Sequence, residues 1–332
     1  MQKLNKFVCA LGLALASSAP LFAQETPQLS LQKKPSVFDH LDLSVNLGST
    51  GVGVDLAAPI GDYVQVRAGF DYLPRFHYNM NFEIQVGDVY STEDAIAEHE
   101  RFNRLANMLE QLTGYRVNKY VDMIGEPTFN NLKFMVDVLP FKRNKHWHFT
   151  AGFYFGSSKI AKAYNATEEM PSLMAVAIYN NMYDKIASGE GIILNIGGMQ
   201  IPMFNDPELE DKILENGRMG MYVGDYKHDN KPYMMEPDKD NMAKAVIKVN
   251  PFRPYLGFGY GGRLMKDSDK YHISFDCGMM MWGGTPHILT HDGTNLSKDV
   301  TNIVGNVGSY VKTIKVFKAY PVLQVRVTQR LF

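Results

Sequence analysis

The chain has few cysteines, no excess of either charge and no long apolar run beyond its first segment. Cysteine occurs only at Cys9 and Cys277 among 332 residues, and 34 Lys and Arg balance 35 Asp and Glu. The balanced charge excludes a protein that coats nucleic acid, because such proteins are basic. Past residue 24, Lys, Asp, Gly or Pro interrupts each apolar stretch within about ten residues, whereas a helix needs about 20 apolar residues to span a bilayer. We therefore expect no transmembrane helix in this part of the chain.

The first segment has the pattern of a signal peptide. Lys3 and Lys6 form a positive start, residues 7–16 form a short apolar run, and Ala23 is the small residue that signal peptidase requires. We predict a signal peptide, 1–23, followed by a periplasmic N-terminal segment, 24–39. Cleavage removes Cys9 and leaves Cys277 without a partner for an intramolecular disulfide. Because only helices and closed β-barrels cross lipid, the remaining chain is either a soluble periplasmic protein or an outer-membrane barrel.

Alternating apolar and polar residues predict the strands, since a strand with two different faces repeats every two residues. Eight segments alternate in this way: 41–47, 52–56, 64–72, 132–138, 147–155, 256–260, 271–279 and 323–328. Their connections are unequal: 59–62, 141–146 and 265–270 are short, whereas 74–130, 159–250 and 284–319 are long. Short turns at one end and long loops at the other are typical of bacterial outer-membrane barrels. We predict an all-β fold in which residues 40–332 form an eight-stranded antiparallel transmembrane barrel.

Two alternative folds are open at this point. A barrel of ten strands follows if 78–90 and 243–250 also cross the lipid. A soluble β-sandwich also has alternating strands, but the apolar face here is rich in Val, Leu, Phe and Met. Aromatic residues on that face lie near strand ends, where a membrane-interface girdle is expected. The predicted girdle consists of Tyr72, Trp147, Tyr260 and Tyr271.

The second face of the predicted strands is polar and charged. In a barrel of eight strands the interior is just wide enough for side chains, so these residues would fill the lumen. Buried charges must pair to be tolerated, and acidic and basic residues nearly balance on this face. The lumen is then either a sealed plug of ion pairs or a narrow polar conduit for small charged solutes. The predicted polar network of the lumen consists of Asp42, Asp55, Arg67, Asp71, Lys133, Asp137, His148, Asp276, Arg326 and Arg330.

The long loops carry helical patterns. Residues 91–114 begin with a capping-box pattern and place apolar residues at helical spacing up to Gly114. A second helix is predicted after Ser172, a candidate cap, and a short third helix at 208–214. Residues 78–86 alternate, which indicates a strand that extends beyond the membrane. Apolar helix faces need a partner, so we expect the helices to pack on each other or over the mouth of the barrel as partly helical extracellular insertions.

Signals for catalysis or metal binding are weak. The sequence contains no zinc-protease, nucleophile-elbow or phosphate-loop motif, and the glycine-rich stretch 257–262 lies in a predicted strand. Asp292, Asn295 and Asp299 offer oxygen ligands without the spacing of a calcium loop. We predict no enzyme activity, no catalytic residue, no metal and no cofactor; His228, His287 and His291 are candidates only by default.

Several stretches of the predicted strands resemble a known family: Gly51-Val-Gly-Val-Asp55, Val66-Arg-Ala-Gly69, Asp137-Val-Leu-Pro-Phe141, Thr150-Ala-Gly-Phe153, Arg253-Pro-Tyr-Leu-Gly-Phe-Gly-Tyr260, Ser274-Phe-Asp-Cys-Gly278, Trp282-Gly-Gly-Thr-Pro286 and Tyr320-Pro-Val-Leu323. They are similar to the small outer-membrane barrels of Gram-negative bacteria, and most closely to a poorly characterised group among them. The resemblance, OmpA- and OmpW-like in architecture, implies an outer-membrane protein, with solute uptake proposed for some relatives. It implies outer-membrane lipid and the barrel-assembly machinery as partners, no nucleic acid, and no catalytic residue; the long loops depart from it.

Two functions are compatible with these patterns. The first is a barrel that is either structural or passes small solutes through a narrow pore. The second is a surface-exposed module whose helical loops recognise a ligand or a partner protein.

Overall fold

The computed structural model describes residues 40–87, 92–141, 145–189, 193–196, 199–202, 207–265 and 268–331. The chain divides into two compact units, Met1–Ser36 and Val37–Phe332, and the fold described below belongs to the second. The predicted signal peptide and the segment 24–39 lie outside the described residues. Among the described helices, none combines the length and the apolar character needed to cross a membrane.

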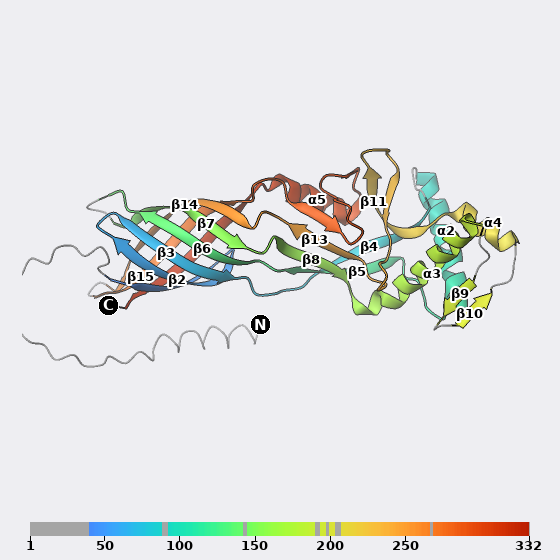
Figure 1. Ribbon diagram of the computed structural model, residues 1–332, viewed down its shortest axis with the longest axis horizontal. Coiled ribbons are helices and arrows are strands. Elements are labelled where there is room, and N and C mark those ends of the chain that lie inside the picture. The colour runs from blue at the N-terminus through green and yellow to red at the C-terminus, as the bar shows by residue number, and fades with distance from the viewer. Residues whose placement is uncertain are drawn as a thin grey trace, which may run out of the picture. The chain divides into compact units, whose positions relative to one another are not determined.

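Eight antiparallel strands form a closed barrel in the order β1-β18-β15-β14-β7-β6-β3-β2 (Figure 1). Seven of these strands contain a predicted alternating segment, and β1 matches the segment 41–47 with a shift of one residue, so the predicted eight-stranded fold is confirmed. The ten-strand alternative is wrong, because residues 78–86 and 244–248 pair in a second sheet rather than in the barrel. The barrel strands are β1 (Asp42–Gly48), β2 (Gly51–Ile60), β3 (Val64–Tyr72), β6 (Asn130–Val138), β7 (Trp147–Gly156), β14 (Phe252–Met265), β15 (Ser268–Met281) and β18 (Ala319–Arg330).

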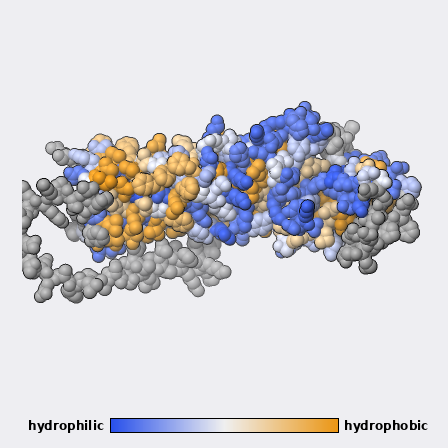
Figure 2. All heavy atoms as spheres, in the orientation of Figure 1, coloured by the Kyte–Doolittle hydropathy of each residue, from blue (hydrophilic) through white to orange (hydrophobic). Residues whose placement is uncertain are grey.

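The two faces of the barrel differ sharply in polarity. Residues that point away from the axis are large and apolar, and they cover the barrel with an apolar surface (Figure 2). Residues at the intervening positions point inward and are buried. Exposed apolar residues of this surface include Leu47, Leu56, Phe70, Leu132, Phe134, Phe149, Phe155, Phe252, Leu256, Phe258, Phe275 and Leu323.

The barrel has two unlike ends. At the first, which we call the terminal end, lie the beginning of β1, the end of β18 and the tight turn between β2 and β3, where Gly61 has φ +72°. At the second, the domain end, β1 and β2 join through a tight turn that Gly51 completes with φ +99°. The other connections at the domain end build a second body, which we call the distal domain.

The distal domain contains an eight-stranded sheet, a two-stranded sheet and four helices. The larger sheet has the order β12-β11-β4-β5-β8-β13-β16, and β17 pairs with β11. Its strands are β4 (Tyr78–Val86), β5 (Tyr120–Pro127), β8 (Lys159–Asn165), β11 (Met219–Tyr226), β12 (Pro232–Met235), β13 (Lys244–Lys248), β16 (His287–Thr290) and β17 (Val300–Thr301). The remaining elements are β9 (Ile193–Ile196), β10 (Met199–Pro202), α2 (Thr92–Thr113), the 3₁₀ turn η1 (Thr167–Glu169), α3 (Met170–Ala187), α4 (Pro207–Asn216) and α5 (Gly305–Val316).

The larger sheet continues the barrel. The neighbouring barrel strands β15, β14, β7, β6 and β3 connect directly to β16, β13, β8, β5 and β4, which follow in the same order (Figure 1). The register between β7 and β14 pairs Phe155 with Phe252, and the same register pairs Lys159 with Lys248 four residues further on. Backbone bonds from Val249 N to the Ser158 oxygen (2.9 Å) and from Gly156 N to the Pro251 oxygen (3.1 Å) bridge the interval.

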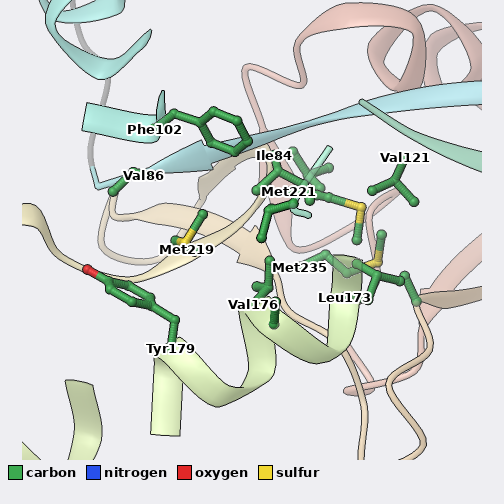
Figure 3. Packing of buried hydrophobic residues seen from close by; sticks show 14 of the residues in the cluster. Ile84, Val86, Phe102, Val121, Leu173, Val176, Tyr179, Met219, Met221 and Met235 are labelled. Carbon is green, nitrogen blue, oxygen red and sulfur yellow. The ribbon is translucent and has the colours of Figure 1, made fainter. Parts of the chain in front are cut away.

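Helices α2, α3 and α5 pack on one face of this sheet and form its hydrophobic core (Figure 3). The helix predicted at 91–114 is α2, which ends before Gly114 at φ +74°; α4 includes the predicted 208–214, and α5 was not predicted. Ser172 does not cap a helix: it lies buried inside α3, where its hydroxyl accepts the Asn118 N–H at 2.9 Å. The core includes Ile84, Val86, Phe102, Leu109, Val121, Met123, Leu173, Val176, Tyr179, Met219, Met221 and Val311.

Candidate functional site

The inward-facing side chains of the barrel form a connected charged cluster. Alternation along each strand brings residues from seven strands into the lumen, and the register then decides which of them meet. The structure places all ten residues of the predicted polar network on the inward-facing positions. Nine of them are at most 8% exposed, and Arg330 is half-buried: Asp42, Asp55, Arg67, Asp71, Lys133, Asp137, His148, Asp276 and Arg326 are the nine.

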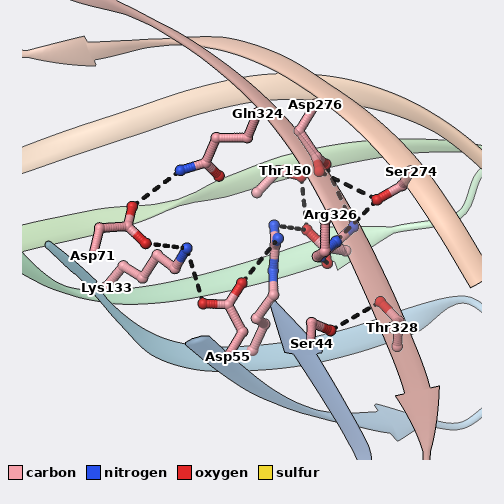
Figure 4. Close-up of polar contacts among 12 residues, drawn as sticks. Ser44, Asp55, Asp71, Lys133, Thr150, Ser274, Asp276, Gln324, Arg326 and Thr328 are labelled. Atoms are coloured by element: carbon pink, nitrogen blue, oxygen red, sulfur yellow. Dashed lines mark hydrogen bonds and ion pairs between the residues drawn. The ribbon is translucent and has the colours of Figure 1, made fainter. Parts of the chain in front are cut away.

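Lys133 lies between two aspartates (Figure 4). Its Nζ is 2.8 Å from Asp55 Oδ1 and 2.7 Å from Asp71 Oδ1. Thr50 donates its hydroxyl to Asp71 Oδ2 at 2.8 Å, and the Gln324 amide donates to the same oxygen at 3.0 Å. Thr50 was missed from the sequence because it lies in a turn rather than in an alternating segment.

Two arginines link the remaining carboxylates. Arg67 contacts Asp55 at 3.6 Å and Asp137 at 3.1 Å, and Arg326 contacts Asp137 at 3.6 Å and Asp276 at 3.4 Å. Thr150 also donates its hydroxyl to Asp137 at 2.7 Å. These contacts join Asp55 to Asp276 through an unbroken chain of opposite charges.

His148 completes this chain. Its Nε2 lies 2.6 Å from Asp276 Oδ1, and Ser274 donates to the other Asp276 oxygen at 3.3 Å. Four aspartates then face three permanent cations and the His148 ring. Because an unpaired buried charge is very costly, this pairing explains how the lumen can hold so many charged groups.

A smaller polar cluster lies at the terminal end of the lumen. Asp42 accepts a hydrogen bond from the Gln65 amide at 3.1 Å and lies 3.4 Å from His40 Nε2. Arg330 Nε is 4.0 Å from Asp42, and its guanidinium also approaches His40. Among the described residues, no ion pair joins this cluster to the central one, and its arginine is partly exposed.

An apolar layer covers the charged cluster toward the domain end. Tyr154 and Tyr255 cross at 85° with their ring centroids 5.6 Å apart, and Trp282 stacks on Tyr320 at 5.8 Å. Trp282 and Tyr320 continue the inward-facing positions of β15 and β18 into this layer. The other buried members of the layer are Phe129, Met135, Val249, Met280 and Val322.

Arg253 lies beside this layer, and among the described residues its guanidinium bonds to carbonyl and amide oxygens rather than to a carboxylate. It is fully buried and donates to the Asn250 carbonyl at 2.7 Å, to the Asn131 side-chain oxygen and to the Ser157 carbonyl. Its guanidinium also lies over the Phe129 ring, 5.1 Å from the centroid. Sequence analysis did not assign Arg253 to the lumen, although its position in β14 has the parity of the inward-facing residues.

Glycines on the inward face give these large side chains their space. A Cβ on Gly259 would overlap the His148 ring, and one on Gly257 would overlap the Tyr255 hydroxyl. A Cβ on Gly69 would overlap the Asp55 carboxylate. The glycine-rich stretch 257–262 is therefore explained by close packing in the lumen.

The predicted girdle residues occupy both ends of the barrel. Tyr72 is exposed at the domain end of β3, and Trp147 and Tyr260 are exposed near the terminal end. Trp147 and Tyr260 form an edge-to-face pair at 5.0 Å, and Tyr271 lies part-buried on the neighbouring β15.

Two clefts of the distal domain are lined by described residues. One, of about 420 Å³, is lined by Tyr78, Asn79, Met80, Asn81, Asp122 and Tyr310. The other, of about 430 Å³, contains Arg218, which is bonded to Glu236 at 2.5 Å and to Asp184, and whose pKa these carboxylates raise. Tyr183, Tyr226 and Tyr233 line the same cleft.

The candidate ligand residues between 287 and 299 form hydrogen bonds with neighbouring residues. The Asp292 carboxylate accepts from the Thr290 hydroxyl (2.6 Å) and the Thr294 N–H (2.9 Å), and Tyr233 lies 2.8 Å away. Asn295 bonds His287 Nδ1 at 2.8 Å, and Asp299 accepts from the Asn295 N–H at 3.1 Å. Among the described residues, no group of three or more His, Cys, Asp or Glu is placed to hold a metal ion.

The geometry defines the class of protein: a closed eight-stranded antiparallel barrel with an apolar exterior and a charged, filled interior. No protein-family model matches the chain, and no curated protein matches it. Two solved structures from Acinetobacter baumannii are similar to it. CarO2 has a TM-score of 0.37 and 12% identity, covering 88% of this chain and 99% of CarO2. CarO has a TM-score of 0.36 and 13% identity, covering 88% of this chain and 97% of CarO. The barrel assignment rests on the strand pairing of this chain itself.

Proposed function

We propose that this chain is an outer-membrane protein of a Gram-negative bacterium, in which a sealed barrel anchors the distal domain at the cell surface for binding a ligand or a partner. The observation that carries the proposal is the filled lumen, whose charged side chains are paired and buried beneath an apolar layer.

The exterior of the barrel supports a membrane location. Soluble monomers rarely expose a continuous apolar surface of this kind. Here each of the eight barrel strands carries exposed large apolar residues, with Tyr72 and Trp147 near the ends of their strands. Figure 2 shows this apolar surface on the face in view. That arrangement matches a lipid-facing band with aromatic borders.

The lumen supports an anchor rather than a pore. A conducting pore needs a continuous water-filled path, whereas Lys133 and its two aspartate partners are at most 4% exposed. Beyond them, Tyr154, Tyr255 and Met280 are also almost completely buried. A solute would have to break ion pairs and displace this aromatic layer, and both steps are costly.

The distal domain is the better candidate for the functional surface. It has its own hydrophobic core of buried side chains from β4, β5, β11, α2 and α3, and it carries both clefts described above. Tyr78, which is 53% exposed, lies beside Asn79 and Asn81 in one of the clefts, and an exposed aromatic ring next to polar side chains suits contact with a partner.

Single-channel recording in a planar bilayer tests the sealed barrel. We expect no steady current from the purified protein after its insertion has been verified, with a known porin as the positive control. A steady, ion-selective current from the inserted wild-type chain would show that the lumen conducts, and the anchor proposal would be wrong.

Cysteine labelling tests the orientation. In a Cys277→Ser background, Asp240→Cys places a thiol on the distal domain and Asp62→Cys places one in the turn at the terminal end. A membrane-impermeant maleimide should label the first in intact cells and the second only after permeabilisation. The opposite pattern would invert the proposed orientation and remove the distal domain from the cell surface.

A further inference from the structure

Two lysines face each other where the barrel continues into the distal sheet. Lys159 and Lys248 are directly opposite in the register of β8 and β13, and His287 is directly opposite Lys248 in β16. Like charges at opposed positions of a sheet are destabilising. Among the described residues, no carboxylate forms an ion pair with either lysine, so none of the described carboxylates offsets their repulsion.

These lysines lie on the lipid-facing side of the strands. The unchanged register that pairs Phe155 with Phe252 also pairs Lys159 with Lys248. Their neighbours Ile160 and Val249 pack inward on the apolar layer of the barrel, which leaves the two lysines on the outer face. Phe155 and Phe252 are 50% and 51% exposed and belong to the apolar surface of the barrel. The outer face therefore changes from aromatic to cationic within four residues.

More cations lie slightly further along the distal sheet, on β8 and just before β4. The Glu126 carboxylate at the end of β5 lies 3.1 Å from Lys162, 3.3 Å from Arg75 and 3.9 Å from His77. Together these groups form a basic belt, which we define as Arg75, His77, Lys159, Lys162, Lys248 and His287. Its four permanent cations face the single carboxylate of Glu126.

The height of the belt agrees with a lipid headgroup layer. Four residues at about 3.3 Å each place Lys159 and Lys248 about 13 Å along the strands beyond the last aromatic pair, or about 10 Å along the membrane normal at a typical strand tilt. The polar layer of a bilayer extends about 5–8 Å beyond each side of its hydrocarbon core. A long lysine side chain can bridge the remaining few ångströms back toward this layer. Phosphate is the charged group in that layer that complements lysine.

We propose that the basic belt binds the phosphate groups of a phosphorylated glycolipid in the leaflet that surrounds the domain end of the barrel. This inference rests on the proposed membrane location. A phosphate between Lys159 and Lys248 would convert their repulsion into attraction, and the remaining cations of the belt would hold neighbouring phosphates.

A lipid titration followed by native mass spectrometry tests the site. The probe is diphosphoryl lipid A added to the protein in neutral detergent micelles, compared with the same lipid after removal of its phosphates. The variant Lys159→Gln/Lys248→Gln should bind the phosphorylated lipid about 30-fold more weakly than wild type, because each lysine near an anionic surface contributes about a factor of five. The matched control Lys212→Gln/Lys239→Gln removes the same charge from exposed positions of the distal domain and should bind like wild type.

Thermal unfolding separates lipid binding from a structural role. Without phosphorylated lipid, the Lys159→Gln/Lys248→Gln variant should unfold at the same temperature as wild type or higher, since a repulsion has been removed. Diphosphoryl lipid A should raise the unfolding temperature of wild type and not that of the variant. Equal binding by variant and wild type, or equal binding of phosphorylated and dephosphorylated lipid, would overturn the inference.

Two further measurements, competition by inorganic phosphate and insertion into lipid vesicles, distinguish the remaining explanations. Inorganic phosphate that displaces the lipid at equal molar concentration would show a site for free phosphate and would overturn lipid recognition. Protein that inserts into phosphatidylcholine vesicles but shows no phosphate preference would refute the belt while leaving the membrane anchor intact. Failure of the folded protein to insert into any vesicle would refute both.

Discussion

The barrel and the distal domain are built from connected strands with opposite polarity. In β6, Lys133 points inward while Phe134 is exposed, whereas in β4 the inward residue Ile84 is fully buried and apolar. Between β7 and β8, the outer face changes from apolar at Phe155 to charged at Lys159, four residues later. Alternation alone therefore defines two faces, and the surroundings of each region decide which face is polar.

The two regions are consequently stabilised by different interactions. The distal core gains stability from apolar burial, at about 25 cal/mol per Å² removed from water. Inside the barrel, the charged cluster gains little net stability from being charged, but it loses much when one partner is removed. Equal-sized substitutions should therefore have unequal effects in the two regions.

The largest effect is expected from Lys133→Met. It leaves Asp55 and Asp71 without the cation that lies 2.8 and 2.7 Å from them. Removal of one partner from a buried ion pair lowers the free energy of unfolding by about 3–5 kcal/mol. Guanidinium unfolding of the barrel in lipid should shift accordingly, and a barrel as stable as wild type would indicate a wet lumen. The double variant Lys133→Met/Asp71→Asn removes one charge of each sign and should recover part of the loss.

A charge on the outside of the barrel should have the next largest effect. Phe134→Arg places a cation on the apolar surface, near the middle of β6 and beside Phe153. In a bilayer this costs about 2–4 kcal/mol near the midplane, whereas in water it costs little. Asn79→Arg, on the exposed outer face of β4, is the matched control. Equal folding yields of both variants in lipid vesicles would contradict a lipid-facing surface.

Much of the barrel was predictable because its strands obey a strict period of two. Each of the eight segments is confirmed as a barrel strand, since apolar-out and polar-in positions keep the same parity along each strand. The ion-pair partners were not predictable. Arg67 and Asp71 lie on one strand, yet Arg67 contacts Asp55 and Asp137 while Asp71 contacts Lys133. Partners are set by the register between strands, which a single sequence does not specify.

The distal sheet was harder to predict for two physical reasons. Its strands follow barrel strands after only a few residues, so the sequence shows no boundary between the two environments. A bulge also interrupts the pairing of β8 with β13 near Ile247 and Lys248, which changes the alternation between faces. Helix α5 was missed because Gly305 and Gly308 weaken its helical pattern, and its stability comes from packing on the sheet.

Removal of one methyl group from an apolar side chain should destabilise the two regions by different amounts. Ile84→Val in the distal core should destabilise that domain by about 0.5–1.5 kcal/mol, because the side chain is fully buried and its surroundings fill the resulting cavity only partly. Ile273→Val on the outside of the barrel should cost less, since lipid can occupy the vacated space. Denaturant unfolding measured in lipid for both variants checks the difference, and an equal loss at both sites would contradict it.

The smallest expected effect concerns acid stability of the distal domain. Burial raises the pKa of Asp292, but hydrogen bonds from Thr290, Thr294 and Tyr233 lower it by more, so the folded-state pKa lies below its ordinary value. A depressed carboxylate pKa contributes stability that is present above the unfolded pKa of about 3.9 and is lost as the pH falls through the folded value. Asp292→Asn should therefore reduce the difference in stability between pH 6 and pH 3, whereas the exposed control Asp211→Asn in α4 should change it less. A tryptophan-independent readout such as far-UV circular dichroism is suitable, because the tryptophans, Trp147 and Trp282, both lie in or beside the barrel strands. An unchanged pH dependence in Asp292→Asn would show that this carboxylate is no more stabilised in the folded domain than in the unfolded chain.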